Sequence, residues 1–182
     1  MSDQLIYSIA NSPSFLRARR SALSGDRSLL QVSRSSWVRG TLRYYIWDRK
    51  KAEGECLRYR HLMISVTDPD SAPAKIPDCQ SRIALLRLSF WDTEDRHYGK
   101  GVISAKHIDE LVRFVNSYSH EVNSIVVHCE MGVSRSAAIV AALIKLAGHS
   151  PYDIFANYLP NLLVYSEILL HSGYEPEEID IE

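Results

Sequence analysis

The sequence predicts an α/β fold with a central, mostly parallel sheet and helices on both of its faces. Short apolar runs typical of buried strands alternate along the chain with longer segments of helical periodicity. Residues 124–127 are apolar without alternation, as expected for a central parallel strand that is covered on both faces. With 182 residues and 46% hydrophobic content, the chain is long enough for one sizeable core.

The first part of the chain is the least regular. Residues 1–27 are rich in serine and arginine and show little periodicity, which indicates an irregular leader. A short strand is expected at 29–32 and a helix at 37–52. Such a leader also suits organelle import, although Asp3 and Asp26 count against that interpretation.

Charge is distributed unevenly between the two parts of the chain. Residues 1–60 hold 12 Lys/Arg against 5 Asp/Glu, a net charge of +7, whereas residues 61–182 hold 9 against 17, a net charge of −8. The two parts either neutralise one another across a shared surface, or the basic part forms a face that attracts anionic partners or substrates. The sequence leaves both interpretations open.

From residue 60 onward, predicted strands and helices alternate regularly. Buried strands are expected at 62–66, 83–90 and 124–127. An amphipathic helix is expected where four apolar residues recur at the helical period: Ile108, Leu111, Val112 and Val115. A helix at 137–147 is apolar all round and therefore buried. Two more helices are predicted, from Pro151 to Pro160 and from Asn161 to His171, with Gly148 and Gly173 as stops.

Membrane, disulfide and metal signals are weak. No apolar run approaches the roughly 20 residues of a membrane span, and the start of the chain does not resemble a signal peptide. The three cysteines form no CxxC pair and no metal-ligand pattern, and their odd count favours a reducing compartment, so a cytoplasmic location is expected. Cys56 and Cys79 are expected to be inert core residues. The histidines other than His128 are expected at the surface.

The segment 127–136, Val-His-Cys-Glu-Met-Gly-Val-Ser-Arg-Ser, carries the chemistry. It lies between the most buried predicted strand and the most buried predicted helix, where α/β folds bind anions. Helix-end amides and Arg135 both favour negative charge, so Cys129 has an electrostatic reason to be a thiolate. Arg135, six positions further on, can grip two phosphate oxygens with its planar guanidinium group.

Two neighbouring residues complete this arrangement. Gly132 lets the loop bend so that successive backbone N–H groups point inward and form an anion-binding nest. Ser136 can donate a hydrogen bond to the sulfur and stabilise it as a leaving group. The residues expected to bind the substrate phosphate are Glu130, Met131, Gly132, Val133, Ser134 and Arg135.

These residues match the HCxxGxSRS signature of the cysteine-dependent protein tyrosine and dual-specificity phosphatases, which the chain resembles over roughly residues 60–172. Residues 63–69 look like the bacterial members. The resemblance implies a two-step hydrolysis of a phosphomonoester through a phosphocysteine on Cys129, without metal or cofactor. It also implies a catalytic domain at 59–182, preceded by a basic extension, 1–58, that has no counterpart. The expected partner is a phosphorylated protein or peptide, with no nucleic acid.

That chemistry needs a general acid for the leaving oxygen and then a base for the attacking water. In similar phosphatases an aspartate in the loop after the preceding strand does both, and Asp92 lies there, 37 residues before Cys129. Asp95 is the alternative. His128 matches the family histidine that supports the loop and the thiolate from behind. Glu130 departs from the small or neutral residue often found after the cysteine, which argues mildly against inositol lipids as substrates.

Two other functions stay open. A phosphate-reading binding module would keep the pocket without turnover, although the cysteine, the arginine and the acid are all present. A rhodanese-like sulfurtransferase also uses a cysteine in an anion-binding loop, and the ending Gly132-x-Ser134-Arg135-Ser136 argues against it. Asn161 is expected to cap a helix, with a contact to the active-site region as the minor alternative. Phosphotyrosine, phosphoserine or phosphothreonine, and non-protein phosphates all remain as candidate substrates.

Overall fold

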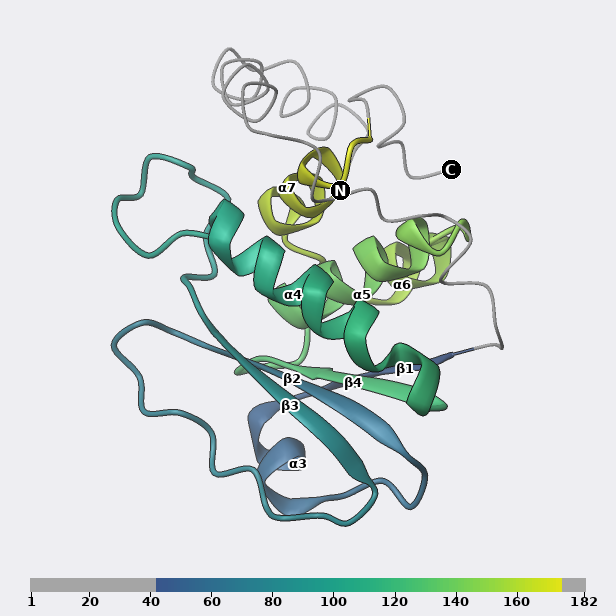
Figure 1. Cartoon of the computed structure of the whole chain (residues 1–182). Helices are drawn as coiled ribbons and strands as arrows, with labels where there is room; N and C mark the ends of the chain where they lie inside the picture. The colour runs from purple at the N-terminus through teal and green to yellow at the C-terminus, as the bar shows by residue number, and fades with distance from the viewer. Residues whose placement is uncertain (1–41, 175–182) are drawn as a thin grey trace.

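The computed structural model describes residues 42–174, in which four strands form a single parallel sheet (Figure 1). The strands are β1 (Arg43–Trp47), β2 (His61–Thr67), β3 (Arg82–Ser89) and β4 (Ser124–His128). Their order across the sheet is β1-β4-β2-β3. The parallel pairing, with helices between β1 and β2 and between β3 and β4, confirms the predicted α/β class.

Helices cover both faces of this sheet, as expected. The helices α4 to α7 lie on one face, and the short α3 lies on the other (Figure 1). Their bounds are α3 (Arg49–Gly54), α4 (Ala105–Tyr118), α5 (Arg135–Leu146), α6 (Tyr152–Asn157) and α7 (Leu162–His171), and a 3₁₀ turn (Ser119–Glu121) follows α4. None of the helices within 42–174 is long and apolar enough to cross a membrane. The cytoplasmic location stays a prediction.

The position of β4 follows from its sequence. This strand lies between β1 and β2, and its apolar side chains are buried on both faces of the sheet. Ile125 and Val127 belong to the large core that includes α4, α5 and α7, whereas Val126 belongs to a smaller core beside α3. Full burial of such a side chain stabilises the fold by about 1.5–3 kcal/mol. The loop that follows β4 therefore begins from a rigid position.

The helix predicted at 37–52 is wrong. The structure has the strand β1 within this range, paired with β4 over its whole length, and α3 begins only after Asp48. The Asp48 side chain accepts a hydrogen bond from Lys51 N at 2.7 Å and so caps a new helix. The aromatic and β-branched residues of β1 suit a strand, and the long-range pairing with β4 decides between the two structures.

Both β1 and α3 lie inside the segment 1–58 that the sequence assigns to an extension. They nevertheless pack against the rest of the fold, since β1 pairs with β4, and Trp47 and Ala52 lie in the smaller core with residues of β2 and β4. As a domain boundary, the division after residue 58 stays a prediction. The strand expected at 29–32 and the leader at 1–27 lie outside the described residues.

The cysteines and one histidine depart from the expectation. Cys56 is exposed and Cys79 is half-buried, and the structure joins their sulfur atoms as a disulfide pair, so neither is an inert core residue. His61, expected at the surface, is only 1% exposed. The two cysteines are 23 residues apart and come from different loops. No local spacing rule could have shown that they meet.

Candidate active site

Within the segment 127–136, residues 129–134 form a loop between the carboxyl end of β4 and the first turn of α5. Cys129 directly follows β4 and is 1% exposed, and Arg135 opens α5 and is 2% exposed. The side chains of Met131 and Val133 point outward, with exposures of 74% and 37%. The loop thus keeps its cysteine and its arginine inside and turns its apolar side chains to the surface.

Gly132 is the point at which the loop packs against the end of β1. Its φ of +66° lies in the left-handed region that favours glycine. A Cβ atom there would lie 2.6 Å from Asp48 N and 2.7 Å from the carbonyl carbon of Trp47. Nearby, Arg49 N donates a hydrogen bond to the Glu130 carbonyl oxygen at 3.1 Å. The shape of the loop therefore depends on a strand that the sequence did not predict.

Polar side chains support Cys129 from two directions. Its Sγ lies 3.1 Å from the hydroxyl oxygen of Ser136, which is fully buried in the first turn of α5. His128 lies behind the loop, with Nε2 2.8 Å from Ser65 Oγ and Nδ1 3.4 Å from the carbonyl oxygen of Cys129. Burial lowers the pKa of His128 below its usual 6.5, so the ring is neutral near pH 7. A neutral ring that donates from Nδ1 to the carbonyl accepts at Nε2 from Ser65.

Arg135 is anchored at the carboxyl ends of β2 and β3. Its Nη1 donates to Asp68 Oδ1 at 2.6 Å and to the carbonyl oxygen of Phe90 at 2.7 Å. Its Nε lies 3.6 Å from Asp92 Oδ2 and has no hydrogen-bond partner, although it is buried. Sequence analysis did not single out Asp68. Its position just after a predicted buried strand was the only available signal, because residues there gather at one edge of a parallel sheet.

Asp92 lies against the loop and is held there by several donors. Its Oδ1 accepts hydrogen bonds from Ser134 Oγ at 2.7 Å and from Asn161 Nδ2 at 2.8 Å. Asn161 also donates to the carbonyl oxygen of Thr93 at 3.1 Å, while its own Oδ1 caps α7 at Val164 N. The predicted cap is therefore confirmed, and the minor alternative, a contact with the active-site region, is present as well.

Asp95 makes its hydrogen bonds within its own segment. Its Oδ1 accepts from His97 N at 2.8 Å, and its backbone N donates to Thr93 Oγ1 at 3.1 Å. Of the two candidate acids, Asp92 is the one that the fold brings beside Ser134 and Arg135.

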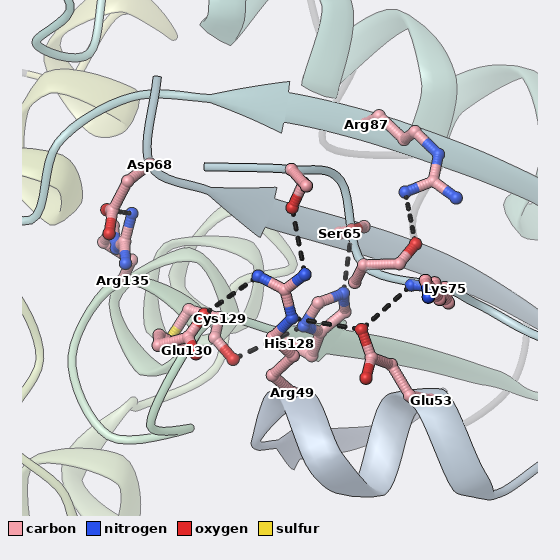
Figure 2. A network of polar contacts seen from close by, with 12 residues as sticks. Arg49, Glu53, Ser65, Asp68, Lys75, Arg87, His128, Cys129, Glu130 and Arg135 are labelled. Atoms are coloured by element: carbon pink, nitrogen blue, oxygen red, sulfur yellow. Dashed lines mark hydrogen bonds and ion pairs between the residues drawn. The ribbon is translucent and has the colours of Figure 1, made fainter. Parts of the chain in front are cut away.

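Glu130 is paired rather than free. Its carboxylate lies 3.3 Å from Arg49 Nη1, and Arg49 Nε also donates to Glu53 at 3.0 Å, so the guanidinium lies between two carboxylates (Figure 2). This pairing offsets the negative charge at the rim and weakens the sequence argument against highly anionic substrates. A pocket of about 530 Å³ opens beside these residues and is lined by Asp48, Arg49, Lys50, Glu53, Gly54, Glu130 and Met131.

Comparison with known sequences identifies the segment that contains this loop. Residues 62–150 match the family described as "Dual specificity phosphatase, catalytic domain". The mouse protein "Dual specificity protein phosphatase 12" is 37% identical over 73 residues, which are 38% of this chain and 20% of the mouse protein. The match thus spans about a fifth of that relative's length.

Solved structures share the fold. The human tyrosine phosphatase-like serine/threonine/tyrosine-interacting protein gives a TM-score of 0.52 at 20% identity, covering 69% of this chain and 87% of that one. Human DUSP28 gives 0.52 at 17% identity, covering 71% and 90%. A mouse putative dual specificity phosphatase complexed with zinc tungstate gives 0.52 at 20% identity, covering 71% and 81%.

At these identities the structural likeness supports the fold alone. These relatives are mammalian, and the particular resemblance to bacterial members stays a prediction. The sequence match shows that residues 62–150 carry a catalytic domain of the dual-specificity phosphatase type, a type of cysteine phosphatase.

Proposed function

We propose that the chain hydrolyses phosphomonoesters of a protein or peptide, as a tyrosine or dual-specificity phosphatase, through a phosphocysteine on Cys129. One observation carries this proposal. The sulfur of Cys129 and the guanidinium of Arg135 flank one loop at the carboxyl ends of the strands, and the carboxylate of Asp92, from a separate segment, lies beside Arg135 there. A nucleophile, an anion clamp and an acid in one place suit phosphoryl transfer.

In the first step the substrate phosphate occupies the loop, against the backbone N–H groups of residues 130–135 and Arg135. The buried Nε of Arg135, which has no hydrogen-bond partner, supports this role because a phosphate oxygen would satisfy it. The thiolate of Cys129 attacks phosphorus while the bond from phosphorus to the leaving oxygen breaks. Asp92 acts as the general acid and gives a proton to that oxygen, so that a neutral hydroxyl departs.

In the second step water attacks the phosphocysteine. Asp92, now a carboxylate, takes a proton from the water, and the phosphorus–sulfur bond breaks to release inorganic phosphate. Ser136, whose hydroxyl oxygen lies 3.1 Å from the sulfur, donates a hydrogen bond to the departing thiolate. The neutral His128 supports the loop from behind through the Cys129 carbonyl, and it does not contact the substrate.

The contacts of Asp92 weigh against the two other functions. A phosphate-reading module needs no general acid, and a sulfurtransferase needs no carboxyl group to protonate a leaving oxygen. Here Ser134 and Asn161 hold the Asp92 carboxyl group beside the loop with two hydrogen bonds, an arrangement that suits proton transfer. Neither alternative has an observation of its own in its favour.

The test is hydrolysis of an aryl phosphate by the wild-type protein and by Cys129→Ser. The variant should lose turnover and still bind phosphate or vanadate, because the loop and Arg135 do the binding while only the sulfur attacks. Residual activity within about tenfold of wild type would overturn the assignment. A panel of phosphotyrosine, phosphoserine, phosphothreonine and small-molecule phosphates then identifies the substrate class.

A further inference from the structure

A second group of reactive side chains lies at the amino-terminal ends of β2 and β3, opposite the catalytic loop. Cys56 precedes β2, His61 is its first residue, and Cys79 precedes β3. One potential ligand atom from each residue lies within 4.8 Å of the other two. The proposed phosphatase chemistry uses none of these side chains, so their proximity needs its own explanation.

We propose that Cys56, His61 and Cys79, with both thiols reduced, bind one thiophilic divalent cation of the zinc class, with water as the fourth ligand. Two thiolates and one imidazole are ligands that zinc prefers, and three protein ligands with one water form a common tetrahedral arrangement. Two thiolates also balance the charge of a divalent ion. This inference is independent of the proposed function.

The distances between the cysteines suit joint binding. With Zn–S bonds of about 2.3 Å, a tetrahedral centre holds two sulfur atoms about 3.8 Å apart. The Cα atoms of Cys56 and Cys79 are 6.3 Å apart, so rotation of the two side chains brings the sulfurs to that separation without moving the backbone. The backbone there is tied into the sheet, since Arg82 N donates to the Cys79 carbonyl oxygen at 3.1 Å.

Neighbouring groups already orient the three ligands. The Nδ1 of His61 lies 2.8 Å from the carbonyl oxygen of Tyr59, which can only accept, so this nitrogen carries the proton and leaves the lone pair of Nε2 for a cation. Metal-binding histidines usually make such a hydrogen bond with the other ring nitrogen. Ser81 Oγ donates to the carbonyl oxygen of Leu57 and lies 3.1 Å from the Cys79 sulfur and 3.3 Å from the Cys56 sulfur.

The competing state is the disulfide between Cys56 and Cys79, in which the sulfurs are no longer thiolates. An experiment must therefore begin from reduced, metal-free protein. The full-length chain carrying Cys129→Ser is suitable, because the catalytic thiol can then contribute no signal. We expect it to bind one equivalent of Co²⁺, with the near-ultraviolet absorption of cobalt–thiolate bonds, and to release the cobalt when Zn²⁺ is added.

Variants in the same background locate the site. Cys56→Ser and Cys79→Ser should each weaken Co²⁺ binding. The loss should exceed the roughly 10–100-fold that follows when a residue that only hydrogen-bonds to a metal ligand is removed. His120→Ala, which removes an exposed histidine elsewhere, should bind as the parent does. Circular dichroism of each variant checks that the fold is kept.

Three results would overturn the inference. One is a protein that forms the disulfide on oxidation but, when reduced, shows no cobalt–thiolate absorption. Another is cobalt or zinc binding that survives both cysteine substitutions. The third is metal binding that needs Cys129 and is therefore absent from the Cys129→Ser background. In each case the phosphatase proposal is unaffected, because its own test depends on turnover.

Discussion

The two ends of the sheet use the same residue types in different surroundings. At the carboxyl ends a single buried cysteine, Cys129, lies at a helix N-terminus in a loop that opens toward Arg135. At the amino ends Cys56 and Cys79 lie together beside His61, within reach of one another and away from the N-termini of the helices within 42–174. The first setting favours a lone nucleophile facing an anion, and the second favours shared binding of a cation. Cysteine chemistry thus depends on the neighbouring backbone and charges more than on the residue itself.

The largest effect among these variants should follow from removing the proposed general acid, Asp92, at the carboxyl end. We expect Asp92→Asn to slow hydrolysis of substrates with poor leaving groups by roughly 10²–10⁴-fold, and of good leaving groups less, because the amide cannot protonate the leaving oxygen. The basic limb of the pH–rate profile should flatten. Asp95→Asn is the matched control and should change neither quantity. The reverse pattern would move the acid to Asp95.

The arginine at the same end comes next. Arg135→Lys should lower kcat/KM for an aryl phosphate by about 10²–10³-fold, since an ammonium group cannot make the paired hydrogen bonds of a guanidinium. Arg60→Lys, an exposed arginine near the start of β2, serves as control and should leave kcat/KM near the wild-type value. A kcat/KM of Arg135→Lys near the wild-type value would mean that positive charge alone, and not the paired hydrogen bonds of the guanidinium, determines the rate.

The dependence of the loop on β1 can be tested with a pair of glycines. Gly132→Ala should lower the free energy of unfolding by more than the about 1–2 kcal/mol of left-handed strain alone, because its Cβ also meets the backbone at Trp47 and Asp48. Gly54→Ala has open space around the new Cβ and should be close to neutral. Urea denaturation measures both. An unchanged stability of Gly132→Ala would mean that the loop does not pack on β1.

The smallest expected effect concerns His128. Burial lowers its pKa in the folded protein below the 6.5 of the unfolded chain. Below pH 6.5 the unfolded chain therefore binds a proton at His128 that the folded protein does not bind. The stability that the neutral His128 contributes at pH 7 declines as the pH falls from about 7 toward 5, by at most about 1.4 kcal/mol per pH unit. Urea denaturation at several pH values should show that the free energy of unfolding depends less on pH in His128→Gln than in wild type. Equal slopes would contradict a neutral, buried His128.

Predictability differed between local and long-range features. The strands and helices from β2 to α7 could be predicted because each depends on apolar periodicity within its own segment. The strand β1 could not, since the pattern at 37–52 also suits a helix and only pairing with β4 selects the strand. The pairing of Glu130 with Arg49 joins residues 81 positions apart, and the sequence contains no sign of it.

By itself, the sequence determined which reactive side chains the loop 129–134 and its two ends carry. The residues from His128 to Ser136 are contiguous, and their order already sets a cysteine at a strand end and an arginine at a helix start. Only the tertiary structure decided what surrounds that loop. Asp68 reaches Arg135 across 67 positions, and Asn161 reaches Asp92 across 69. Such contacts arise where parallel strands end side by side and α7 packs beside them, an arrangement set by the packing of the whole core and not by any local pattern.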